Sequence, residues 1–166
     1  MKRFFATGIL FTLLIGITSL APASKYKYYS EEANCTITFP AEYTTQVEEK
    51  DEYKSVQTQA IDKDMIFMMI YSKHNQSLTN EDELCEISFG AFMEGLGGNP
   101  SGKETWKLKK HTGLKSEFDV SREDLIGDYR VVIIGQIQYQ IVAVSPKASW
   151  DAKKATKFFK SFKVGK

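Results

Sequence analysis

Apolar and polar residues alternate over several short segments in the first half of the chain, which is the pattern of half-buried β-strands. Residues 35–39 and 43–47 alternate in this way, and residues 53–61 form a third such segment. Residues 65–71 are apolar on both faces, so we expect a central strand that is covered on both sides. The short gaps between these segments favour antiparallel pairing of successive strands.

A helical pattern follows this first group of strands. Thr79 is the expected N-cap, because its hydroxyl can accept a hydrogen bond from the first helical turn. Gly97 and Gly98 mark the end, since glycine readily adopts the left-handed conformation found past a helix C-terminus. Between these points the apolar residues recur at the spacing of a helix face: Leu84, Cys85, Ile87, Phe89, Ala91, Phe92 and Met93.

Alternation returns in the second half of the chain. Residues 105–110 and 116–120 predict two strands, and residues 129–134 and 137–144 predict two more. The last two segments flank Gly135-Gln136, a two-residue loop of the kind that closes a tight hairpin.

A second helix is predicted from about Trp150 onward. Its inward face is apolar: Ala152, Ala155, Phe158, Phe159 and Phe162. Groups of closely spaced strands that alternate with single helices are typical of the α+β class. We therefore expect an α/β/α sandwich, with a central, mainly antiparallel sheet and two principal helices.

The N-terminus has the layout of a secretory signal peptide. Basic residues are followed by the apolar run 4–20 and by the small residues of Ala21-Pro22-Ala23. We expect residues 1–23 to be removed, which makes the protein exported, either periplasmic or secreted. Residues 24–33 then form a polar lead-in, and residues 34–166 form a single domain. The alternative is an uncleaved anchor helix, which would hold the protein at the membrane.

Composition and charge exclude some classes of protein. The chain has 166 residues, of which 26% are charged and 13% are aromatic, as in one globular domain. Lys and Arg number 22 and Asp and Glu number 21, so the net charge is +1. A nucleic-acid-binding domain would show a strong basic excess, so we expect no nucleic acid among the partners.

Three short segments carry a family resemblance. They are Thr36-Ile37-Thr38-Phe39-Pro40, the hairpin Gly135-x-x-x-Tyr139-Gln140-Ile141, and Lys157-Phe158-Phe159-Lys160-Ser161-Phe162-Lys163 near the C-terminus. With the element order, they resemble the PsbP-like superfamily, which includes the photosystem II extrinsic subunit and Ran-binding Mog proteins. The resemblance spans about residues 34–164 and implies helices around an antiparallel sheet. It also implies binding or assembly more than catalysis, and it assigns no functional residue because its motifs are packing patterns.

The segment Gly97–Glu104 has the glycine and lysine spacing of a phosphate-binding loop but lacks its chemistry. Such a loop needs Ser or Thr after the lysine and must lead from a strand into a helix. Here Glu104 follows Lys103, and the segment leads from a predicted helix into a predicted strand. We therefore interpret it as a helix stop and a surface turn.

Methionine and histidine residues offer no convincing metal site. Met65 and Met69 would point to one face of their strand and Met68 to the other, so three thioethers cannot converge on copper. His74 and His111 are far apart in the sequence, and no zinc-hydrolase or serine-hydrolase motif contains them. We expect no metal, no cofactor and no recognisable catalytic residue.

Cys35 and Cys85 are the two cysteines of the chain. An even number of cysteines in an exported protein favours pairing, so we expect a disulfide between them. The alternative is two buried free thiols that fill space in different layers of the fold.

Lysine residues provide the one candidate surface for a partner. Lys107 and Lys109 alternate with apolar residues, and with His111 they form the expected contact surface for an unknown protein partner. The last helix also has a lysine face, and both could dock an acidic partner or anionic lipid head groups. The alternative is structural, because lysines protect edge strands and complement helix C-termini.

These observations favour an exported, non-enzymatic domain that binds a partner or supports an assembly. The alternative is a hydrolase or a small-ligand-binding enzyme whose residues converge only in the fold. A cleft that places His74 or His111 within reach of a carboxylate would favour the enzyme.

Overall fold

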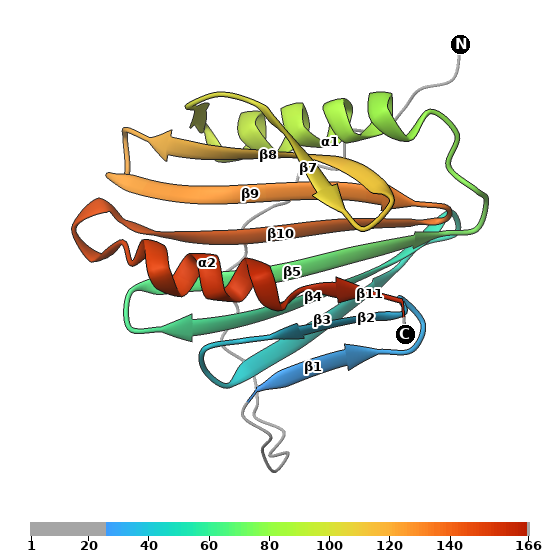
Figure 1. Ribbon diagram of the computed structural model, residues 1–166, viewed down its shortest axis with the longest axis horizontal. Coiled ribbons are helices and arrows are strands. Elements are labelled where there is room, and N and C mark those ends of the chain that lie inside the picture. The colour runs from blue at the N-terminus through green and yellow to red at the C-terminus, as the bar shows by residue number, and fades with distance from the viewer. Residues whose placement is uncertain (1–25, 166) are drawn as a thin grey trace.

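Figure 1 shows a large antiparallel sheet with two helices and a smaller sheet beside it, in a computed structural model that describes residues 26–165. The predicted signal peptide, residues 1–23, lies outside the described residues. The helices are α1 (Glu81–Leu96) and α2 (Ala152–Ser161), and a 3₁₀ turn, η1 (Lys147–Ser149), precedes α2. The strands are β1 (Lys27–Ser30), β2 (Cys35–Thr38), β3 (Tyr43–Glu49), β4 (Tyr53–Asp62), β5 (Met65–His74), β6 (Asn99–Pro100), β7 (Glu104–Leu108), β8 (His111–Val120), β9 (Leu125–Ile134), β10 (Ile137–Pro146) and β11 (Lys163–Val164).

The large sheet has eight strands in the order β3-β4-β5-β10-β9-β8-β6, and β7 also pairs with β8. All of its pairings are antiparallel, which confirms the predicted α+β class. A second sheet has three strands in the order β1-β2-β11. It was not predicted: the segment 24–33, expected to be a lead-in, contributes β1, which pairs with β2.

Two hydrophobic clusters lie on the two faces of the large sheet. Phe67 and Met69 of β5 belong to one cluster, and Met68 and Ile70 belong to the other, because successive strand residues point to opposite faces. We call the first the α2-side core, since it includes Phe158 and Phe159 of α2 together with residues of the small sheet. The second is the α1-side core, which contains Cys85, Phe89, Phe92 and Met93 of α1.

Helix α1 ends where the sequence predicted but begins one residue later. Its N-cap is Asn80, with a left-handed φ of 63°, and not Thr79. Asparagine adopts this conformation more readily than a β-branched threonine. At the C-terminus Gly97 has a φ of +66°, and the Gly98 amide donates to the Met93 carbonyl at 2.9 Å, as in a Schellman motif.

The β7–β8 hairpin corrects the predicted strand boundaries. The sequence predicted strands at 105–110 and 116–120, whereas β8 already begins at His111 and the turn lies at Lys109 and Lys110. Gly113 concealed this strand, because glycine has low strand propensity. The structure requires glycine at position 113, since a Cβ there would overlap the carbonyl oxygen of Val131.

The β9–β10 hairpin and the start of α2 follow the sequence closely. Ile134 pairs with Ile137 around the two-residue loop, and Gly135 has a φ of +62°, so the predicted hairpin is confirmed. Helix α2 begins after Asp151, whose carboxylate accepts a 2.9 Å hydrogen bond from the Lys154 amide. This bond satisfies one of the free N–H groups of the first turn.

The expected disulfide between Cys35 and Cys85 is absent, and both thiols are free and buried. Cys35 is 2% exposed in the α2-side core, whereas Cys85 is 1% exposed in the α1-side core, so the large sheet separates them. Burial raises the pKa of Cys35 to about 12 and that of Cys85 to about 11. The disulfide prediction is therefore wrong, and the alternative of two buried thiols in different layers is correct.

Candidate functional site

The three residues of the predicted contact surface lie on the β7–β8 hairpin but do not share one face. Lys107 is exposed and pairs with Thr112, whose hydroxyl accepts a 2.7 Å hydrogen bond from the lysine ammonium. His111 is half-buried and pairs with Leu108. Lys107 and Leu108 are neighbours on β7 and therefore point to opposite faces of the sheet. His111 shares the face of its partner Leu108, so Lys107 and His111 are directed away from each other.

Lys109 occupies the turn of this hairpin and connects it to the C-terminal segment. Its backbone has a positive φ of 54°, and its ammonium group donates to the carbonyl oxygen of Val164 in β11. The ring of Trp106 packs nearby, with its centroid 6.1 Å from that of Phe162. The hairpin turn is therefore held against the segment that follows α2.

This contact brings together the two groups of lysines that the sequence placed far apart. Helix α2 buries Phe158 and Phe159, which leaves the lysines of its outer face exposed. We call the combined region the basic surface, and its exposed members are Lys109, Lys110, Lys157, Lys160 and Lys163.

The lysines of the basic surface are not neutralised within the described part of the chain. None of them forms an ion pair with a carboxylate of residues 26–165. Lysines elsewhere do so: Lys115 bonds Glu104 at 2.7 Å, and Lys154 bonds Asp62 at 2.7 Å. An uncompensated cluster of one charge sign creates a local potential that attracts anionic partners.

Arg130 supports the junction between α2 and the hairpin. Its guanidinium group lies 4.1 Å from the ring centroid of Phe159 and 5.8 Å from that of Trp106. A 3.0 Å ion pair joins it to Asp128, two residues earlier on β9. Burial raises the pKa of the Asp128 carboxyl, and the Arg130 charge opposes that shift. This pair was not predicted from the sequence, where the spacing Asp128-x-Arg130 at the boundary of a predicted strand is the signal for it.

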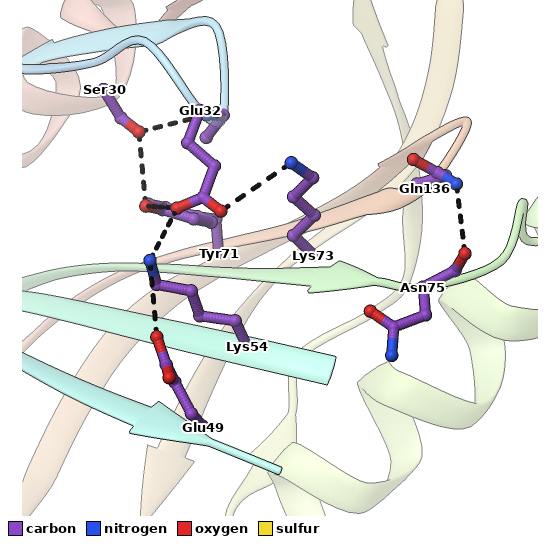
Figure 2. A network of polar contacts seen from close by, with 9 residues as sticks. Ser30, Glu32, Glu49, Lys54, Tyr71, Lys73, Asn75 and Gln136 are labelled. Atoms are coloured by element: carbon purple, nitrogen blue, oxygen red, sulfur yellow. Dashed lines mark hydrogen bonds and ion pairs between the residues drawn. The ribbon is translucent and has the colours of Figure 1, made fainter. Parts of the chain in front are cut away.

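A second polar network connects the small sheet to the large one (Figure 2). The Tyr71 hydroxyl donates to Glu32 at 3.3 Å and accepts from Ser30 at 3.2 Å. Glu32 also forms ion pairs with Lys54 at 3.0 Å and Lys73 at 3.7 Å. The hydrogen bond from Lys54, and then the charges of both lysines, lower the pKa of Glu32. Every charge in this network has a partner, so its role is to fix the two sheets together.

Neither histidine of the chain faces a catalytic partner in the described residues. The Nε2 atom of His74 is buried without a hydrogen bond partner in this region, and desolvation lowers its pKa. The ring of Tyr53 lies 5.7 Å away, centroid to centroid. No ion pair within residues 26–165 joins His74 or His111 to a carboxylate. The charge of Glu52 raises the pKa of His74 and opposes the effect of desolvation.

A depression of about 230 Å³ lies beside the β4–β5 turn. Its lining consists of Asp62, Lys63, Asp64, Met65, Ser149, Asp151 and Lys154. The carboxylates of Asp62 and Asp151 are already bonded to Lys154. No group of three or more His, Cys, Asp or Glu residues within 26–165 is placed to hold a metal ion.

The remaining motifs of the sequence are structural, as expected. Gly97–Glu104 contains the helix stop, the two-residue strand β6 and the start of β7, and Lys103 forms an ion pair with Glu86. Met65 and Met69 lie in the α2-side core, and Met68 lies in the α1-side core. Neither helix of the described region is long and apolar enough to cross a membrane.

Sequence comparisons identify no relative of this chain. No known family matches it, and no curated protein matches it either. Its fold is similar to that of cyanobacterial PsbP (CyanoP) from Synechocystis sp. PCC 6803, with a TM-score of 0.61, 9% identity, and coverage of 90% of this chain and 98% of that chain. A crystal structure of a protein from Bacteroides thetaiotaomicron VPI-5482 matches with a TM-score of 0.44 and 14% identity, over 87% of this chain and 50% of that one. The chain therefore has a PsbP-like fold, as the sequence resemblance indicated.

Proposed function

We propose that this protein is an exported, non-enzymatic binding domain that docks an acidic partner protein through the basic surface. One observation carries the proposal: the contact of Lys109 with Val164 joins two distant segments that bear five exposed lysines, none of which has a carboxylate partner within residues 26–165. The PsbP-like fold supports a binding or assembly role. The predicted signal peptide supports export.

The construction of the surface fits a docking role. The β7–β8 hairpin is held in place by Lys109 on Val164 and by Arg130 between Trp106 and Phe159. The lysines are therefore presented from a rigid support, which limits the ordering entropy lost on binding. Charge complementarity at exposed lysines mainly increases the association rate and makes it dependent on salt.

Charge reversal tests this proposal. The tagged protein would be purified from its native envelope as the wild type and as the double variant K110E/K160E. The matched control is K63E/R122E, because Lys63 and Arg122 are also exposed and without an ion pair in the described region but lie in the β4–β5 and β8–β9 turns, outside the basic surface. We expect K110E/K160E to recover at least tenfold less of the partner, and K63E/R122E to recover as much as the wild type.

Two results would contradict the proposal. One is equal recovery of the partner by both double variants and the wild type. The other is salt-sensitive binding of the protein to phosphatidylglycerol vesicles with no protein recovered, which would assign the basic surface to anionic lipid.

A further inference from the structure

Strand β3 forms one edge of the large sheet, and no strand of residues 26–165 pairs with its outer side. Every residue of β3 except Tyr43 is exposed, and Val47 exposes 57% of its surface. Such an edge presents a row of unpaired backbone N–H and C=O groups, which is a template for another strand.

The opposite edge of the same sheet is more strongly protected than β3. There the outermost strands are β6, which has two residues and contains Pro100, and β7, which has five residues and contains Lys107. Short strands, proline and lysine all discourage pairing between edges. Strand β3 has seven residues without proline or lysine, and it pairs with β4 without a bulge from Tyr43 to Glu49. Its two charged residues, Glu48 and Glu49, lie together at its C-terminal end and leave residues 43–47 uncharged.

The hydrogen bonds at the β3–β4 turn fix which backbone groups of β3 face outward. The Lys50 amide donates to the Tyr53 carbonyl at 2.9 Å, so these two residues form a hydrogen-bonded pair. In an antiparallel ladder such pairs alternate along the strand. Gln46 and the other even-numbered residues of β3 therefore bond to β4, and the outward backbone groups belong to Tyr43, Thr45, Val47 and Glu49.

We infer that β3 pairs antiparallel with β3 of a second copy of this chain, about a two-fold axis at Gln46. In this register Thr45 of one copy lies opposite Val47 of the other, and Tyr43 lies opposite Glu49. Every outward backbone group of one strand then meets an outward group of the other. The β-branched pair of Thr45 and Val47 also covers the most exposed apolar side chain of β3.

Charge favours a second copy as the occupant. The same register places Lys50, which pairs with Glu48 of its own chain at 2.8 Å, opposite the exposed Glu42 of the other copy, so the ammonium group can bridge the two carboxylates. Glu42 has no ion pair of its own within residues 26–165. Glu48 lies opposite Thr44, and the two Glu48 residues are separated by about 13 Å along the strands, which exceeds the Debye length of about 8 Å at physiological salt. An axis at Glu48 would instead place these carboxylates directly opposite each other, which is destabilising.

A cysteine at the axis tests the register. In Q46C the new thiols of the two copies face each other in a non-hydrogen-bonded pair, with Cα atoms about 4.5 Å apart, which a disulfide can span. T44C is the matched control, because its two thiols would be about 13 Å apart. Cys35 and Cys85 are buried and do not compete. We expect oxidation to convert Q46C to a covalent dimer at least tenfold faster than T44C.

The oligomeric state tests the association itself. In Q46K two ammonium groups would meet at the axis, whereas T105K places the same substitution on an exposed site of β7. Sedimentation velocity over a range of concentrations should show dimers for the wild type and T105K, and a dissociation constant at least tenfold weaker for Q46K. Melting temperatures would show that Q46K remains folded. The inference would be overturned if the wild type is monomeric, if Q46K leaves the dimer unaffected, or if Q46C and T44C cross-link equally. It would also be overturned if a peptide strand of another protein occupies the β3 edge.

Discussion

Gly113 lies where β8 packs so closely against β9 that no side chain fits. A Cβ at this position would overlap the Val131 carbonyl oxygen and lie 2.9 Å from the Cβ of Val132. We expect Gly113→Ala to destabilise the fold by about 1–3 kcal/mol, the usual cost of overpacking. Gly90→Ala is the matched control, because nothing lies within 4 Å of a Cβ there and the helix gains about 0.5–1 kcal/mol. In urea unfolding, the free energy of unfolding should therefore decrease for Gly113→Ala and increase for Gly90→Ala.

Glu32 supplies a pH dependence of stability whose sign can be predicted. Its partners Lys54 and Lys73 lower its pKa in the folded state below the ordinary value of 4.5. The stabilisation is therefore complete above pH 4.5 and is lost as the pH falls through the folded-state pKa. We expect Glu32→Gln to lower the free energy of unfolding by about 0.5–1 kcal/mol at neutral pH, as for a partly exposed ion pair.

Unfolding curves at several pH values check this prediction. The difference between wild type and Glu32→Gln should shrink as the solution is made more acidic. Glu123→Gln is the control, because Glu123 is exposed and has no ion pair in the described part of the chain. A difference that persists unchanged in strong acid would show that the Glu32 charge is not the cause.

The stability of helix α2 depends on its N-cap residue, Asp151. The Asp151 carboxylate accepts the Lys154 amide hydrogen at 2.9 Å, and nothing else caps this end by a side chain in the structure described. Asp151→Ala should lower the free energy of unfolding by about 1 kcal/mol. Asp151→Ser should lower it much less, because a serine side chain can also cap the helix. Thermal unfolding followed by circular dichroism distinguishes them, and equal losses would refute a capping role.

Sequence patterns predicted those elements whose periodicity is unbroken. The alternation of residues 137–144 correctly predicted β10. The helical spacing of Phe158 and Phe162 correctly predicted that both side chains are buried. Where a residue interrupts the pattern for a tertiary reason, the prediction failed. Gly113 broke the alternation of β8 because its neighbour β9 leaves no room for a side chain. The short strands β1 and β11 were missed because the hydrogen bonds that define them come from β2, distant in sequence from β11.

At the scale of the whole molecule, residues far apart in sequence decide the candidate sites. Cys35 and Cys85 satisfied the rule for an exported disulfide, yet the fold places the large sheet between them. Lys109 and Lys163 belong to separate elements, and only the packing of the hairpin turn on β11 unites them in the basic surface. The sequence therefore identified the candidate residues, whereas the contacts between the layers of the fold could be established only from the structure.

The most direct test of the account is the dissociation constant of the co-purified partner, measured against salt concentration. For the wild type we expect affinity to fall steeply from low ionic strength to physiological ionic strength and above, because the basic surface is exposed and its charges are screened. K110E/K160E should bind at least tenfold more weakly and with a shallower dependence on salt, whereas K63E/R122E should follow the wild type. An affinity independent of salt, or equal for the two double variants, would contradict the claim that this surface binds an acidic partner.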